Sequence, residues 1–127
     1  MVWHDDLTKR KRTGGRKKAY RKRRKYEAGR FPVETQLGEP ERKLERTKGG
    51  GLKVKLVSDR WVNLSDPKTG KTERVRILSV VKNPANVDWD RRGIITKGTI
   101  VRTERGLAKI ISRPGQNGVL NAIPIEE

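Results

Sequence analysis

The sequence predicts a mainly β protein, a small antiparallel barrel of about six strands preceded by an extended basic N-terminal arm. Two observations lead to this prediction. Residues 9–25 contain twelve lysines and arginines and no acid. Hydrophobic residues make up 31% of the chain. Most of them follow residue 51 and alternate with polar residues over short stretches, as in half-buried strands. We therefore expect a basic arm and linker over residues 1–48 and the barrel domain over residues 49–127.

The basic run over residues 9–30 has almost no side chain that could enter an apolar core. Like charges along it repel each other, and ordering the backbone costs roughly 1–2 kcal/mol per residue. We therefore expect this arm to be disordered alone and to fold on a dense polyanion, where each neutralised phosphate releases counterions. Gly14 and Gly15 permit a sharp bend, and the two tyrosines of the run can stack on unpaired bases.

The segment 31–48 is polar and is interrupted by two prolines and Gly38. Residues 41–46 follow Pro40, which is favoured at the first position of a helix, and could form one or two helical turns. Because Leu44 is the only side chain there to bury, we expect a lead-in strand or an irregular linker instead. The three glycines that follow, residues 49–51, indicate a joint.

The first strands of the barrel are expected over residues 52–56 and, after a tight turn at Asp59 and Arg60, over residues 61–64. A loop with Pro and Gly in turn positions leads to the strongest strand, residues 72–82. In that strand Val75, Ile77 and Val81 are predicted to share one face, with Arg74 and Arg76 on the other. The segment Asn83-Pro84-Ala85-Asn86 then ends the strand.

The last strands are shorter. Residues 94–96 and 99–102 flank Lys97-Gly98, which indicates a bulge or turn. Residues 104–106 close a hairpin onto 107–112, and residues 114–118 close another onto 119–125. Strands about 8–12 residues apart, with no helix of useful length, favour a small barrel or barrel-like sandwich.

The charge of the chain limits its ligands. Its 127 residues include 32 basic and 15 acidic ones, a net charge of +17. Residues 1–30 hold 13 basic and 3 acidic residues (+10), and residues 31–127 hold 19 and 12 (+7). This imbalance indicates nucleic acid or an anionic membrane. We expect no membrane association, because no apolar run is long enough to span one and the arm lacks the apolar face of an interfacial helix.

No catalytic, metal or cofactor site is expected. The chain has no cysteine and one histidine, His4, predicted to lie on the surface near a flexible end. The absence of cysteine and of an apolar N-terminal signal agrees with a cytosolic protein. Gly70-Lys71-Thr72 resembles the end of a phosphate-binding loop, but Ser65 stands where that motif needs glycine. Asp88 and Asp90 are expected to form surface ion pairs, and Trp61 and Trp89 to pack on the barrel rather than stack on bases.

The candidate RNA-binding residues are the cations of the arm, its two tyrosines and its Gly-Gly pair, together with three cations near the loop before the strongest strand. They are Lys9, Arg10, Lys11, Arg12, Gly14, Gly15, Arg16, Lys17, Lys18, Tyr20, Arg21, Lys22, Arg23, Arg24, Lys25, Tyr26, Arg30, Lys68, Lys71 and Arg74. Arginine forks grip phosphate bidentately. A solvated charge run or a nuclear localisation signal is the alternative interpretation of the arm.

Several stretches resemble a ribosomal family. Residues 13–30, TGGRKKAYRKRRKYEAGR, closely resemble the N-terminal signature of the eighth small-subunit protein of the archaeal and eukaryotic type (S-eight-e). Residues 74–86 resemble the family's central strand, and residues 95–101 and 112–118 resemble its compact archaeal members. Residues 31–48 match least well.

The resemblance implies a structural, non-enzymatic protein of the small ribosomal subunit, located in the cytoplasm. Its arm would thread among ribosomal RNA helices, with the barrel on the surface and neighbouring ribosomal proteins as further partners. No small-molecule substrate is implied. Without the resemblance, the sequence is also compatible with two other functions. One is a DNA-compacting or chromatin-associated protein that uses the same arm, and the other is an RNA-modifying enzyme or its accessory subunit.

Overall fold

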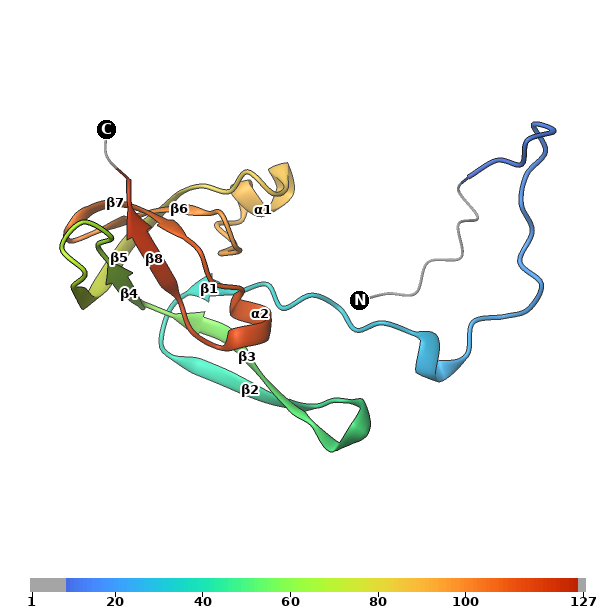
Figure 1. The fold of residues 1–127 in the computed structure, drawn as a ribbon, viewed down its shortest axis with the longest axis horizontal. Coiled ribbons are helices and arrows are strands. Elements are labelled where there is room, and N and C mark those ends of the chain that lie inside the picture. The colour runs from blue at the N-terminus through green and yellow to red at the C-terminus, as the bar shows by residue number, and fades with distance from the viewer. Residues whose placement is uncertain (1–8, 126–127) are drawn as a thin grey trace. The chain divides into compact units, whose positions relative to one another are not determined.

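A computed structural model describes residues 9–125 (Figure 1). The chain divides into two units between Pro32 and Val33. Residues 33–48, which we had grouped with the arm, therefore fall in the same unit as the barrel. His4, expected on the surface, lies outside the described residues.

The described part of the first unit, residues 9–32, contains only local structure. It has an isolated bridge between Arg10 and Arg16 and one 3-10 helix, η1 (Lys25–Glu27). Every described residue of this unit is exposed or half-buried. This agrees with a sequence that offers nothing to an apolar core. Disorder of the free arm and its folding on a polyanion stay predictions.

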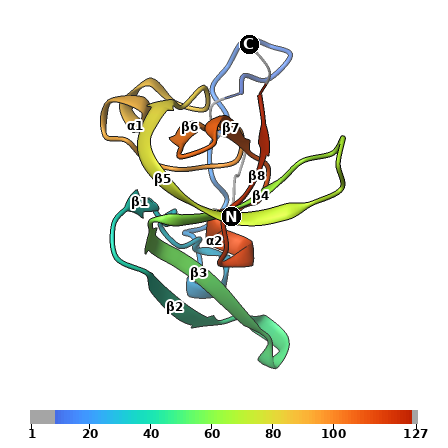
Figure 2. The ribbon, with the colours of Figure 1, turned by 90° about the vertical axis from the view of Figure 1, so that its left-hand side faces the viewer.

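Five strands of the second unit form a closed barrel, in the order β4-β5-β6-β7-β8 (Figure 2). They are β4 (Trp61–Ser65), β5 (Thr72–Lys82), β6 (Ile100–Thr103), β7 (Gly106–Ile110) and β8 (Asn121–Pro124). Four pairings are antiparallel, and the pair that closes the barrel, β4 with β8, is parallel. The predicted mainly β barrel is confirmed, with five strands in place of about six.

The other predicted strand belongs to a separate three-stranded sheet of order β1-β3-β2. Its strands are β1 (Gln36–Leu37), β2 (Glu41–Arg46) and β3 (Leu52–Asp59). Strand β2 pairs antiparallel with β3, and the short 3-10 turn η2 (Lys48–Gly50) joins them. The polar segment after Pro40 is thus a strand, one of the two expected conformations. Its backbone pairs with β3 on one side, although nearly all its side chains are exposed.

The core of the second unit lies inside the barrel and extends under β3. Its buried hydrophobic residues are Leu56, Val62, Val75, Ile77, Ile95, Val101, Ala108, Ile110, Leu120 and Ala122. The prediction that Val81 shares the buried face of β5 is wrong, because Val81 is 49% exposed. The register of β5 against β6 shifts twice after Ile77, and these irregularities change which residues face inward. Val80 packs against the core instead.

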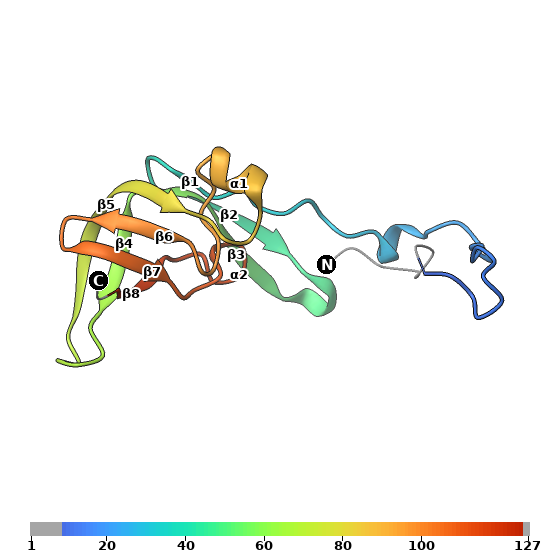
Figure 3. The ribbon, with the colours of Figure 1, turned by 90° about the horizontal axis from the view of Figure 1, so that it is seen from above.

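Two short helices occupy segments expected to be loops (Figure 3). Helix α1 (Val87–Arg91) begins after Asn86, whose side chain accepts a hydrogen bond from the backbone N–H of Asp88. Helix α2 (Pro114–Asn117) has proline at its first position and ends at Gly118, which has a φ of +70°. Helix α2 packs on β3, so the loop before β8 also fixes the second sheet.

Gly118→Ala is expected to destabilise the second unit strongly. A Cβ there would lie 2.6 Å from Cγ1 of Val54 and 3.2 Å from its carbonyl oxygen. Overpacking of this kind typically costs about 1–3 kcal/mol, in addition to roughly 1–2 kcal/mol for an L residue at positive φ. Denaturant unfolding of the full chain would measure the loss.

Gly70→Ala is the matched control. Gly70 has a φ of +68° and no atom within 4 Å of an added Cβ. It should show only the backbone cost of about 1–2 kcal/mol. Equal losses in the two variants would contradict the close approach of Val54 to Gly118.

Candidate nucleic-acid interface

A tight turn near the beginning of the arm includes the Gly-Gly pair. The backbone N–H of Gly14 donates to the carbonyl of Lys11, and that of Lys11 donates to the carbonyl of Gly15, each at 3.0 Å. Gly14 has a φ of +82°, a conformation that glycine adopts readily. Arg10 Nη1 donates to the Gly14 carbonyl at 2.9 Å. The turn therefore brings cations on its two sides close together.

A second local cluster surrounds Glu27, the only acid within residues 9–30. The guanidinium of Arg21 binds both carboxylate oxygens of Glu27, with Nη1 to Oε2 at 2.8 Å and Nη2 to Oε1. The backbone N–H of Arg24 donates to Glu27 Oε2 at 3.1 Å. Arg21 Nε also donates to the hydroxyl of Tyr20 at 3.0 Å, and its guanidinium lies 5.1 Å from the centre of that ring. One acid therefore organises the middle of the arm.

The charges of this cluster are stable at neutral pH. The hydrogen bonds from Arg21 are the main cause that lowers the pKa of Glu27 to about 2, and the same bonds raise the pKa of Arg21. A carboxylate with a lowered pKa keeps its contact above its ordinary pKa and loses it as the pH falls toward the lowered value. The Arg21–Glu27 pair is therefore intact throughout the physiological range, and it reduces the cationic charge that the arm offers.

The loop between β4 and β5 carries two predicted cations, Lys68 and Lys71, and is held by Asp66. The Asp66 carboxylate accepts hydrogen bonds from the Lys68 backbone N–H at 2.9 Å and the Thr69 hydroxyl at 3.0 Å. The first of these bonds is the main cause that lowers the pKa of Asp66. The loop leads into strand β5 and not into a helix, which agrees with rejection of a phosphate-binding loop. Both lysines are exposed.

Arg74, the third predicted cation of the barrel, lies on β5 beside Trp61 of β4. Its guanidinium is 5.1 Å from the centre of the Trp61 ring, within the range of a cation–π interaction. Trp61 is half-buried, and with Asn63 it lines a shallow pocket next to Arg74. Trp89 is also half-buried, on α1. Arg74 is thus already stacked on an aromatic ring of the barrel.

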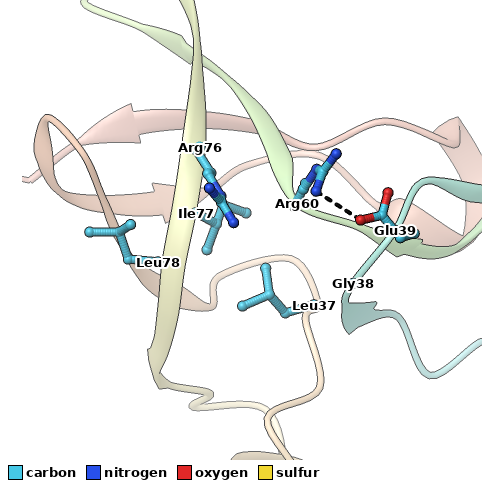
Figure 4. A pocket seen from close by; sticks show the side chains of 7 residues that line it. All are labelled: Leu37, Gly38, Glu39, Arg60, Arg76, Ile77 and Leu78. Carbon is cyan, nitrogen blue, oxygen red and sulfur yellow. Dashed lines mark hydrogen bonds and ion pairs between the residues drawn. The ribbon is translucent and has the colours of Figure 1, made fainter.

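A second pocket lies between the β1–β2 turn and β5 (Figure 4). It is lined by Leu37, Gly38, Glu39, Arg60, Arg76, Ile77 and Leu78. Arg60 Nη1 donates to Glu39 Oε1 at 2.7 Å, as the figure shows. Because Glu39 compensates Arg60, a phosphate would meet a weaker positive field here than along the arm.

The sequence interpretation missed the cations of residues 41–55, the segment of β2, η2 and the outer part of β3. Six of these residues are basic: Arg42, Lys43, Arg46, Lys48, Lys53 and Lys55. The available signal was a glycine joint between two stretches of strand length, which is a hairpin pattern. Because Leu44 is the only side chain of residues 41–46 to bury, the sequence leaves that segment as a lead-in strand or an irregular linker and does not pair it with residues 52–56.

Neither a metal cluster nor a membrane-spanning helix is found in the part of the chain that the structure describes. No group of three or more His, Asp or Glu side chains within residues 9–125 could hold a metal ion. No helix within those residues is long and apolar enough to cross a membrane.

Comparison with known proteins identifies the family. The sequence profile of the family described as ribosomal protein S8e matches residues 4–125. The chain is 49% identical to small ribosomal subunit protein eS8 of Staphylothermus marinus over the full length of both chains. It is 46% identical to the protein of that name in Methanocorpusculum labreanum, over 99% of this chain and 100% of the relative. For the one in Nanoarchaeum equitans, identity is 50% over 84% of each chain. The resemblance predicted from residues 13–30 is thereby confirmed, and the chain belongs to the ribosomal protein S8e family.

Proposed function

We propose that this protein is a structural constituent of the small ribosomal subunit and binds ribosomal RNA through its basic arm, residues 9–30. One observation carries the assignment of the arm. Residues 9–25 hold twelve cations and no acid, and none of their side chains is buried. Family membership supports the ribosome as the place of action, since the curated relatives are named small ribosomal subunit proteins. The protein acts there without catalysing a reaction.

Phosphate neutralisation is the proposed mechanism of the arm. Lysines and arginines replace condensed counterions along the RNA backbone, and the released ions drive binding. Arginine forks bind phosphate oxygens in pairs. These contacts carry no sequence information, so specificity comes from the shape of the folded RNA. The turn at Gly14 and Gly15 allows the arm to change direction between RNA helices.

The barrel gives the arm a folded body and adds a smaller contact with RNA. Lys68 and Lys71 are exposed at the end of one hairpin, with Arg74 on the adjoining strand. We propose that these three cations meet phosphates of the same ribosomal RNA. Neighbouring small-subunit proteins are the further partners, and the cytoplasmic ribosome is the location.

A DNA-compacting function remains the second candidate, because an arm that binds phosphates would also bind duplex DNA. Binding of this type is independent of sequence. The family of the chain favours RNA. The experiments below therefore compare the two nucleic acids directly.

Deletion of residues 1–30 is expected to remove the protein from small subunits while the barrel stays folded. All ten residues of the hydrophobic core lie between Leu56 and Ala122, so the deletion removes none of them. Sucrose-gradient sedimentation of a tagged copy in cells would measure incorporation, and far-UV circular dichroism would report the fold. Normal occupancy of the truncated protein in purified subunits would contradict the proposal.

Replacing Lys17, Lys18 and Lys22 by glutamine is expected to flatten the salt dependence of RNA binding. Each lost phosphate contact changes the slope of log K against log salt by about 0.7–0.9, so three contacts give about 2–3. The matched control replaces Lys82, Lys97 and Lys109, which are exposed on the second unit, and should leave the slope unchanged. Equal slopes in the two triple variants would argue against the arm.

A competition assay at physiological salt distinguishes the two candidate functions. The full chain should prefer structured small-subunit RNA over duplex DNA, because the arm is proposed to fit between RNA helices. A preference for duplex DNA would support compaction instead.

Glu27→Gln is expected to strengthen RNA binding at low salt. Without the carboxylate, Arg21 becomes available to a phosphate, and the salt slope should steepen by about 0.7–0.9. Filter binding over a salt series would measure this. Weaker binding with an unchanged slope would instead mean that Glu27 holds Arg21 in the position needed for RNA.

A further inference from the structure

The β2–β3 ribbon, residues 41–55, extends from the barrel as a two-stranded hairpin (Figures 1 and 3). Strand β1 pairs only with the inner end of β3, at Ser58 and Asp59, so β2 is an edge strand. The ribbon ends in a turn of three glycines, closed by a hydrogen bond from the Thr47 N–H to the Gly51 carbonyl at 2.7 Å. Its end therefore presents backbone with few side chains.

One face of the ribbon carries an apolar stripe, with arginines beside it. Leu44 lies directly opposite Val54, and Leu52 lies opposite Arg46, so the two leucines are diagonal neighbours on this face. The stripe begins in the core at Leu56 and passes over the half-buried Val54. It ends at Leu44 and Leu52, which are 66% and 69% exposed. The stripe thus continues beyond the part of the body that covers it.

The other face is basic and carries an unfavourable pair. Lys43 lies directly opposite Lys55, and like charges in this position destabilise a sheet. Glu45 forms an ion pair with Lys55, which compensates one of the two lysines. The whole ribbon holds six basic and two acidic residues, a net charge of +4. Phosphates at the edges of the ribbon would relieve the repulsion.

The base of the ribbon is fixed to the body. Arg42 Nε donates to the Gly118 carbonyl at 2.9 Å, and its Nη2 donates to Oδ2 of the buried Asp59 at 3.0 Å. Val54 is in contact with Gly118 on the same side. The ribbon is consequently ordered before it meets a partner, and a preorganised surface loses little conformational entropy on binding.

We propose that this ribbon is a second RNA-binding surface, which lays its leucine face on the minor groove of a ribosomal RNA helix. The inference rests on the proposed function, because it takes ribosomal RNA as the ligand. A protein partner is disfavoured, since two leucines amid cations offer far less than the roughly 800 Å² per partner of a standard protein interface. The major groove of A-form RNA is too narrow for side chains, whereas its minor groove is wide and shallow.

In this arrangement each part of the ribbon has a separate contact. Leu44 and Leu52 meet the ribose surface. Lys43 and Lys53 begin on the opposite face, one on each strand, and their long side chains reach round the two edges of the ribbon to phosphates on both sides of the groove. The glycine turn permits close approach of backbone to the sugar edges. Recognition is of RNA shape, as expected for double-stranded RNA.

Two double variants of the full chain test this inference, with small-subunit ribosomal RNA as the probe over a salt series. Lys43→Gln with Lys53→Gln should flatten the salt slope by about 1.4–1.8. Leu44→Ser with Leu52→Ser should lower the affinity about tenfold at every salt concentration, because an apolar contact contributes no counterion release. All four side chains are exposed, and the substitutions leave the backbone pairing of the two strands in place. The midpoint of thermal unfolding should therefore not change, and it serves as the folding control.

The matched controls lie elsewhere on the same unit. Val87→Ser changes a side chain that is 70% exposed on α1, and Lys82→Gln with Lys97→Gln removes two exposed lysines. Neither should alter affinity or slope by as much. Ribbon variants that bind like the wild type would overturn the inference, while a loss confined to the arm variants would leave the proposed function standing.

The orientation of the ribbon has its own test in assembled subunits. Because the chain has no cysteine, Lys48→Cys gives a unique attachment point for an iron–EDTA cleavage reagent beside the glycine turn. Hydroxyl radicals from it should cut both strands of one RNA helix, at positions that face each other across the minor groove. Lys97→Cys is the control attachment. Absence of RNA cleavage from position 48, or cleavage of a neighbouring protein alone, would overturn the inference.

Discussion

Asp59 lies where β3 ends and the chain bends into the barrel, and its carboxylate is buried. Oδ1 accepts the backbone N–H groups of Arg60 and Trp61 at 2.8 and 3.0 Å, and Oδ2 accepts the guanidinium of Arg42. A buried charge is tolerated only when it is paired and hydrogen-bonded. Here those partners come from the bend, from the first barrel strand and from β2. The two sheets and the ribbon therefore share one electrostatic junction.

The proposed functions of the arm and the ribbon would use two different ways to bind a polyanion. In the arm, like charges are dense and none of the described side chains is buried, so we expect its order to depend on the ligand. In the ribbon, backbone pairing and the Arg42 contacts supply order beforehand, and the charge is lower. On binding, the arm would gain affinity and reach at an entropic cost, whereas the ribbon would contribute a fixed shape.

Local patterns in the sequence were sufficient to predict the barrel class and the family. Alternation identified β5 and its buried Val75 and Ile77, and the glycine and proline positions identified its neighbouring hairpins. The phase change that exposes Val81 was not predictable, because it arises from pairing irregularities with β6. The parallel closure of β4 with β8 joins strands about sixty residues apart, which no local pattern records. Strand β2 was ambiguous, since its order comes from its partner strand and not from burial.

The candidate site was predictable in a similar way. Charge density alone marked the arm, and its contacts with RNA stay predictions. The Arg21–Glu27 pair was not foreseen, because residues six positions apart come into contact in neither a helix nor an extended strand. Arg42 was missed because its role depends on Gly118, seventy-six positions later in the chain.

The closure of the barrel by its first and last strands has a consequence for the order of events during synthesis. Strand β4 cannot complete its pairing until β8 has left the exit tunnel, whereas residues 9–30 emerge well before any barrel strand. Contacts between distant strands also form slowly compared with local ones. A nascent chain thus carries its cationic segment outside the tunnel while the body is still unfolded, so the proposed binding of the arm to a polyanion could begin before the barrel closes.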